Sequence, residues 1–100
     1  MKILVRTLAE TNTDGRVMIL EELEASPVNG FDGIAIANTS KTYLKGFCIY
    51  DTATGLYILW GRTKKEALEK LEQNRLRIEE ARKTELYKKR LKEFEEMKKL

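Results

Sequence analysis

One stretch of this sequence constrains the fold more than any other: the chain from Lys64 to Lys99 contains neither glycine nor proline. Thr63 and Glu66 stand at its start with the spacing of a capping box, in which each side chain bonds a free backbone N–H of a new helix. Acid-first pairs such as Glu66 and Lys70 recur along it at i,i+4 spacing, which stabilises a helix. The pattern predicts one long amphipathic helix over residues 63–99, ending only with the chain.

This helix would be longer than the rest of the protein is wide. About 36 helical residues span roughly 54 Å, whereas a compact body made from the preceding residues would measure about 25 to 30 Å. We therefore expect the distal half to protrude or to pair. Its apolar face carries side chains that would dock on a second copy of the chain or on a target protein, namely Tyr87, Leu91, Phe94 and Met97. The same pattern also fits a helix that bends near residues 83–85 and folds back on its own sheet, or a frayed tail.

The preceding residues, 1–61, are expected to form a β-rich body. Runs rich in Ile, Val, Leu and aromatic residues alternate with turn residues, which is typical of short antiparallel strands. Residues 16–25 fit either a strand or a helix, and we favour a hairpin strand. The remaining predicted strands cover residues 2–9, 34–37, 43–50 and 56–60. Together with the helix they predict an α+β fold in one domain over residues 1–100, with a small antiparallel sheet of four to five strands packed on one long C-terminal helix.

The predicted hairpin of residues 43–60 has apolar side chains on both faces. In a strand successive side chains point to opposite faces, so Phe47 and Ile49 lie on one side of the first arm and Cys48 and Tyr50 on the other. A sheet with two apolar faces must be covered on both. We expect a helix on one face and another layer, or another chain, on the other.

Composition excludes several kinds of chemistry. The chain has no histidine, which removes Ser-His-Asp and Cys-His catalysis and every zinc site that contains histidine. Cys48 is the only cysteine, so no internal disulfide can form, and its apolar neighbours favour a buried, inert thiol. We expect no catalytic residues, no metal site and no cofactor. The absence of a signal-peptide pattern and of a long apolar run favours a cytoplasmic protein without a membrane partner.

Charge is unevenly distributed along the chain, and this suggests nucleic-acid binding as an alternative function. Residues 1–61 hold five Lys/Arg and seven Asp/Glu, a net of 5 − 7 = −2, whereas residues 62–100 hold fourteen and nine, a net of 14 − 9 = +5. Four basic residues lie on a broadly shared side of the predicted helix and could track phosphates of a nucleic acid, namely Arg75, Arg82, Lys89 and Lys92. Interleaved glutamates compensate that charge, so we favour a solvated face.

These observations favour a small non-catalytic protein-binding module. We expect it to act as an inhibitor or accessory protein, of a phage or other mobile element acting on a host protein, with self-association into a homodimer through the C-terminal helix. The alternative is a nucleic-acid-binding protein that uses the basic helix. No small-molecule substrate is indicated.

Overall fold

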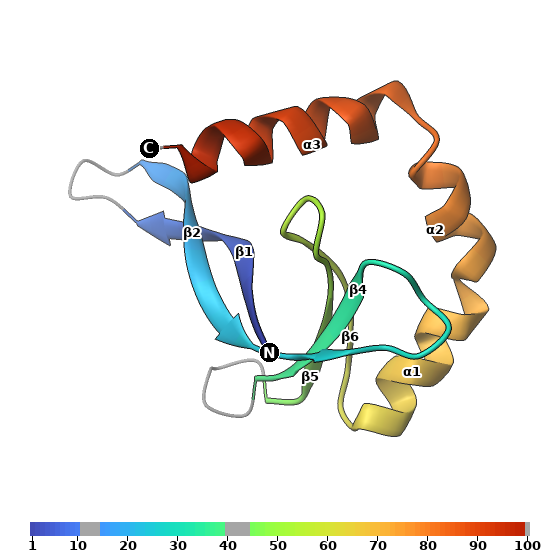
Figure 1. Cartoon of the computed structure of the whole chain (residues 1–100). Coiled ribbons are helices and arrows are strands. Elements are labelled where there is room, and N and C mark those ends of the chain that lie inside the picture. The colour runs from blue at the N-terminus through green and yellow to red at the C-terminus, as the bar shows by residue number, and fades with distance from the viewer. Residues whose placement is uncertain (11–14, 40–44, 100) are drawn as a thin grey trace.

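The computed structural model describes residues 1–10, 15–39 and 45–99, and these form an α+β fold of two sheets and three helices (Figure 1). In chain order the elements of this described part are β1 (Lys2–Glu10), β2 (Arg16–Glu24), β3 (Ser26–Pro27), β4 (Ile34–Asn38), β5 (Phe47–Asp51), β6 (Leu56–Gly61), α1 (Lys64–Gln73), α2 (Arg75–Ala81) and α3 (Glu85–Lys98). The strand predicted over residues 16–25 is confirmed as β2. Of the strand predicted over residues 43–50, the part before residue 45 lies outside the described residues.

The strands do not form the single sheet that we expected. β1 and β2 pair with each other antiparallel, in a register that runs from Lys2 opposite Glu24 to Glu10 opposite Arg16. The other strands form a four-stranded antiparallel sheet in the order β3-β4-β5-β6. The separate two-stranded sheet arises because the apolar second face of the β5–β6 hairpin needs a cover, which β1 and β2 supply.

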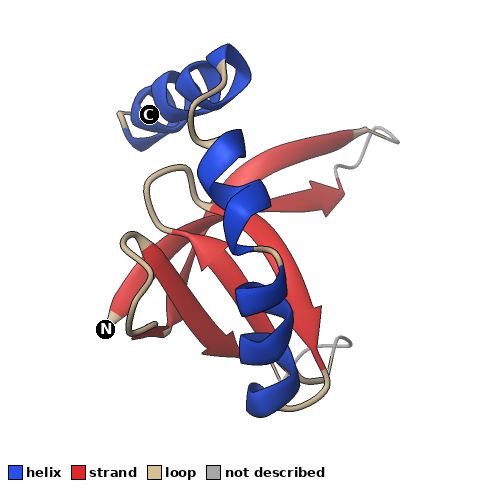
Figure 2. Ribbon diagram, turned by 90° about the vertical axis from the view of Figure 1, so that its right-hand side faces the viewer, coloured by secondary structure: helices blue, strands red, loops and turns tan. Residues whose placement is uncertain are grey.

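Two apolar cores separate three layers (Figure 2). On one face of the larger sheet, Ile3 and Val5 of β1 pack against small and aromatic side chains of β4 and β5, including Ala35 and Tyr50. Cys48 belongs to this core and is buried, as predicted. On the opposite face α1 packs its buried side chains against isoleucines of β4 and β5. The expectation that both faces of the hairpin are covered is therefore confirmed, with a helix on one and a second sheet on the other.

The helical region is broken into three helices, so the prediction of one continuous helix is wrong. At Asn74 the backbone leaves the helix with φ −105° and ψ 11°, and its side-chain amide donates to the carbonyl of Lys70 at 2.8 Å. At Thr84 the backbone is extended, with φ −82° and ψ 156°. The Thr84 hydroxyl donates to Ala81 O at 2.7 Å and accepts from Tyr87 N at 3.1 Å. Short polar side chains that bond the backbone in this way compete with helix continuation. The predicted cap by Thr63 is confirmed, since Glu66 N donates to Thr63 Oγ1 at 3.1 Å. The Glu66 carboxylate accepts from Arg62 N at 2.8 Å, one residue before the position that a capping box requires.

The break at Thr84 sends α3 back across the protein. Figure 1 shows α3 running from the end of α2, over the β5–β6 turn, to the β1–β2 hairpin. Phe94 is its anchor, with only 1% of its surface exposed. Gly55 makes room for the ring: it has φ +70°, and a Cβ there would lie 2.6 Å from Cε1 of Phe94. The distal half therefore does not protrude, and the fold-back alternative describes the structure.

Candidate binding groove

An open groove of about 380 Å³ lies between α2 and β6. Its floor is apolar, and one end carries polar and charged side chains. The apolar lining residues are Leu56, Ile58, Leu59, Ile78 and Ala81. The polar and aromatic lining residues are Asp51, Thr54, Tyr57, Asn74, Arg77, Arg82 and Tyr87. Apolar concave surfaces with a few fixed polar groups are the usual form of a binding site, so this groove is our candidate.

The groove exists because α2 does not follow α1 onto the sheet. α1 buries Ala67 and Leu71 completely against the sheet, whereas none of the described residues of α2 is buried. Ile78 of α2 is half-buried and packs at the border of the α1 core. The redirection at Asn74 therefore leaves a space beside β6 that no side chain of the described residues fills.

The polar end of the groove is a fixed cluster around Asp51, which is only 5% exposed. Its carboxylate accepts from the Thr54 hydroxyl at 3.0 Å and pairs with Nη2 of Arg82 at 3.3 Å. Burial, followed by a hydrogen bond with Asp51, raises the pKa of Tyr87 to about 12. Asp51, Arg82 and Tyr87 come from the end of β5, the end of α2 and the start of α3, so their contacts fix how the second break is held against the sheet.

The remaining charge in the groove belongs to Arg77. Arg77 is exposed, and it takes part in none of the ion pairs formed within the described part of the chain. The charge of Arg82 is neutralised by Asp51. The described lining therefore presents one uncompensated positive charge next to an apolar floor. Tyr57, which is 53% exposed, adds an aromatic ring that packs edge-on against Tyr50 with ring centroids 6.3 Å apart.

The four side chains predicted as a protein interface share one face of α3, but this face is turned toward the chain itself. Tyr87 lines the groove and Phe94 is buried over Gly55. Leu91 is half-buried, and half-buried Met97 lies beside Met18 in a shallow depression at the hairpin. Phe94 is thus committed to the core and is not available on the surface of this conformation.

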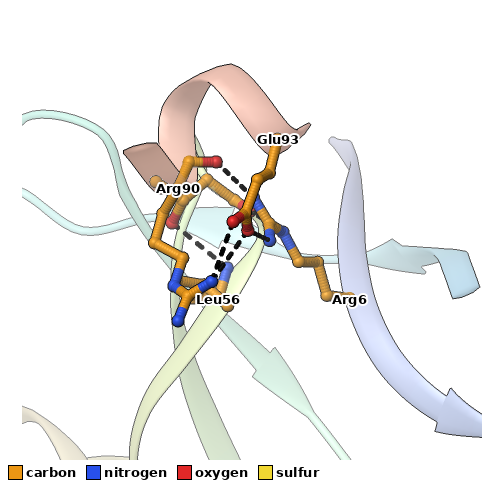
Figure 3. Close-up of polar contacts among 5 residues, drawn as sticks. Arg6, Leu56, Arg90 and Glu93 are labelled. Carbon is orange, nitrogen blue, oxygen red and sulfur yellow. Dashed lines mark hydrogen bonds and ion pairs between the residues drawn. The ribbon is translucent and has the colours of Figure 1, made fainter. Parts of the chain in front are cut away.

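A buried arginine holds α3 in place (Figure 3). The side chain of Arg6 is 5% exposed, and its Nε donates to the carbonyl of Thr54 at 2.8 Å. Its terminal nitrogens bond the carbonyl of Arg90 and, at 3.3 Å, the carboxylate of Glu93. Hydrogen bonds from Arg90 and then from Arg6 lower the pKa of Glu93. This role of Arg6 was not predictable, because Arg6 stands in an ordinary apolar strand pattern.

The basic residues of the nucleic-acid alternative are distributed over α2, its C-terminal end and α3. Arg75 stacks on Phe31, 3.9 Å from the ring centroid, and pairs with Glu72 at 2.8 Å. Arg82 is bonded to Asp51 and to the carbonyls of residues 32 and 33. Lys89 and Lys92 are exposed on α3, which the break at Thr84 separates from α2. Two of the four basic groups are therefore engaged within the chain.

The sequence pattern did not indicate the groove that Ile78 and Ala81 line. It also did not indicate Arg77 or the edge position of Tyr57. Asn74, inside the predicted helix of residues 63–99, was the one available signal, because asparagine favours helix ends over helix interiors.

Comparison with protein-family models, with curated proteins and with solved structures finds no match for this chain. Within the described ranges, no cluster of three or more Cys, Asp or Glu side chains is placed to hold a metal ion. None of the helices in those ranges has the length and apolar character needed to cross a bilayer.

Proposed function

We propose that this chain is a small non-catalytic protein-binding module that takes its partner in the groove between β6 and α2. The observation that carries the proposal is the groove itself, an apolar floor next to an exposed tyrosine and an uncompensated arginine. Tyrosine and arginine are the side chains most often found at energetically dominant positions of protein interfaces. A role as an accessory or inhibitory protein follows from this mode of action, since such a protein acts by occupying a surface of its partner.

The polar end of the groove supports a binding role over a catalytic one. Asp51 is held by Thr54 and Arg82, and burial, followed by Asp51, raises the pKa of Tyr87. A carboxylate whose oxygens are occupied by neighbouring side chains serves to fix the turn and two helix ends in place. We do not extend the proposal to self-association through α3, because its predicted anchor Phe94 is 1% exposed.

The proposal is tested by capturing partners from a lysate of the source cells. The wild type is compared with two variants of α2, one altered inside the groove and one altered outside it. Ala81→Gln places a longer side chain in the groove at an exposed position, whereas Leu76→Gln alters a residue that is 74% exposed and lies outside the groove lining. Both replacements keep a good helix former. We expect a stoichiometric protein partner that survives nuclease and high salt, is lost with Ala81→Gln and is retained with Leu76→Gln.

Two results would refute the proposal. Equal capture by Ala81→Gln and the wild type would show that the partner binds elsewhere. Loss of all captured material after nuclease treatment would favour the nucleic-acid alternative, whose binding should also weaken steeply with salt.

A further inference from the structure

The edge of the larger sheet opens into the groove. β6 is the last strand of that sheet, in the order β3-β4-β5-β6, and no other strand of the described chain pairs with its outer side. Four consecutive residues of β6, 56–59, line the groove. The register with β5 shifts at Ile58, so Ile58 and Leu59 both pack on the α1 side of the sheet, whereas Tyr57 packs against Tyr50 of the opposite core. A groove lined by side chains from both sides must include the edge of the strand.

Side chains already bond the backbone at both ends of this edge. Leu56 N donates to the hydroxyl of Thr54 at 3.3 Å, and the carbonyl of Trp60 accepts from Nζ of Lys70 at 3.1 Å. The stretch between these bonds is the open part of the edge. Exposed strand edges offer unpaired N–H and C=O groups and are templates for pairing with another chain.

We propose that the occupant of the groove is an extended segment of the partner protein, which adds as a strand to β6 and carries an acidic residue toward Arg77. The inference rests on the proposed function and specifies the partner's chemistry. Main-chain hydrogen bonds to β6 supply affinity in this mode, and alternate side chains of the segment supply specificity by entering pockets.

The lining determines what the segment should look like. At about 3.3 Å per residue, residues 56–59 match a segment of about four residues. The side chains that face α2 should be apolar, because they meet Ile58, Ile78 and Ala81. The positive charge of Arg77 favours an aspartate or glutamate in the segment. Among the described lining residues the one carboxylate, Asp51, does not repel this acid because it is paired with Arg82.

The test selects peptides on the intact protein and then asks how they bind. A displayed library of random seven-residue peptides is selected on the wild type and depleted on Ala81→Gln. We expect enriched peptides that alternate apolar residues with an acid. Methylating backbone nitrogens on one edge of such a peptide should weaken binding about tenfold or more, because it removes main-chain hydrogen bonds, whereas methylating the other edge should have little effect. Arg77→Glu should weaken acidic peptides about fivefold and favour versions in which lysine replaces the acid.

The outcomes separate this inference from the proposed function. Enriched peptides that tolerate methylation on either edge, or that ignore the charge reversal at Arg77, would overturn strand addition while the groove still binds. No enriched peptide at all, with lysate capture still lost in Ala81→Gln, would mean that the occupant is a folded surface or a second copy. Lysate capture that does not depend on the groove would remove the proposed function itself.

Discussion

The guanidinium of Arg6 lies 5.4 Å from the centroid of the Phe94 ring, which brings together a residue of the first strand and one of the last helix. The same guanidinium bonds the β5–β6 turn at Thr54 and the backbone of α3 at Arg90. α3 is therefore attached to the body by a few specific contacts around one buried cation. Because Tyr87 at the start of α3 closes one end of the groove, these contacts also set the shape of the candidate site.

Replacing Arg6 should be among the most destabilising changes in the chain. Arg6→Ala leaves the carbonyl of Thr54 without its buried donor and removes the bonds to α3, so we expect a loss of about 3 kcal/mol in the free energy of unfolding. Arg90→Ala is the matched control, since its side chain is 40% exposed and pairs with the same Glu93; it should cost less than about 1 kcal/mol. Urea unfolding measures both. Equal effects for the two variants would contradict the role given to Arg6.

Replacing Gly55 by alanine should lower the free energy of unfolding more than replacing Gly30, which also has a positive φ. Gly55→Ala combines a left-handed backbone with a Cβ 2.6 Å from the Phe94 ring, and we expect it to cost about 3 kcal/mol. Gly30 has φ +84°, but a Cβ there would lie 3.8 Å from Nη2 of Arg75, so Gly30→Ala should cost only about 1 kcal/mol. Unfolding experiments that found the two variants equally stable would mean that Phe94 does not pack over Gly55.

The sign of the change in the free energy of unfolding caused by Thr84→Ala distinguishes a broken helix from a continuous one. If Thr84 caps α3, alanine should lower the free energy of unfolding by about 1 kcal/mol. In a continuous helix the same change would raise stability, because alanine has the higher helix propensity. Thr63→Ala removes a cap under either description and serves as the positive control. A stabilising Thr84→Ala would restore the prediction of one long helix.

Tyr87 should respond to alkaline pH in a defined way. Its pKa is raised to about 12, above the value of about 10 for a tyrosine in an unfolded chain, so its contribution to stability is complete below about pH 10 and is lost as pH rises toward 12. Tyr87→Phe should cost about 1 kcal/mol at neutral pH, because the bond to Asp51 is lost. That difference should shrink between about pH 10 and 12. Ultraviolet titration of tyrosinate should also lose one ionisation near pH 12, and the loss of an ionisation near pH 10 instead would contradict the contact with Asp51.

The strands were predictable because their signals are local. Alternating apolar residues around Gly55 define the β5–β6 hairpin, and its two apolar faces correctly required a cover on each side. The helix breaks were not predictable from the absence of glycine and proline, because Asn74 and Thr84 interrupt the helix through side-chain bonds to the backbone. The direction of α3, and with it the burial of Phe94, depends on Arg6 at the other end of the chain. The groove follows from these long-range contacts, so no single segment of sequence indicates it.

The central claim is that a partner protein occupies the groove between β6 and α2, and amide hydrogen exchange of the captured complex tests it most directly. The account predicts slower exchange on binding for amides of residues 56–59 and of α2, with little change on the outer face of α3 that carries Lys89 and Lys92. Ala81→Gln should abolish this protection and Leu76→Gln should leave it intact. Protection confined to the backbone amides of β2, around the exposed Val17 and Ile19, or to those of α3, would place the partner elsewhere and contradict the account.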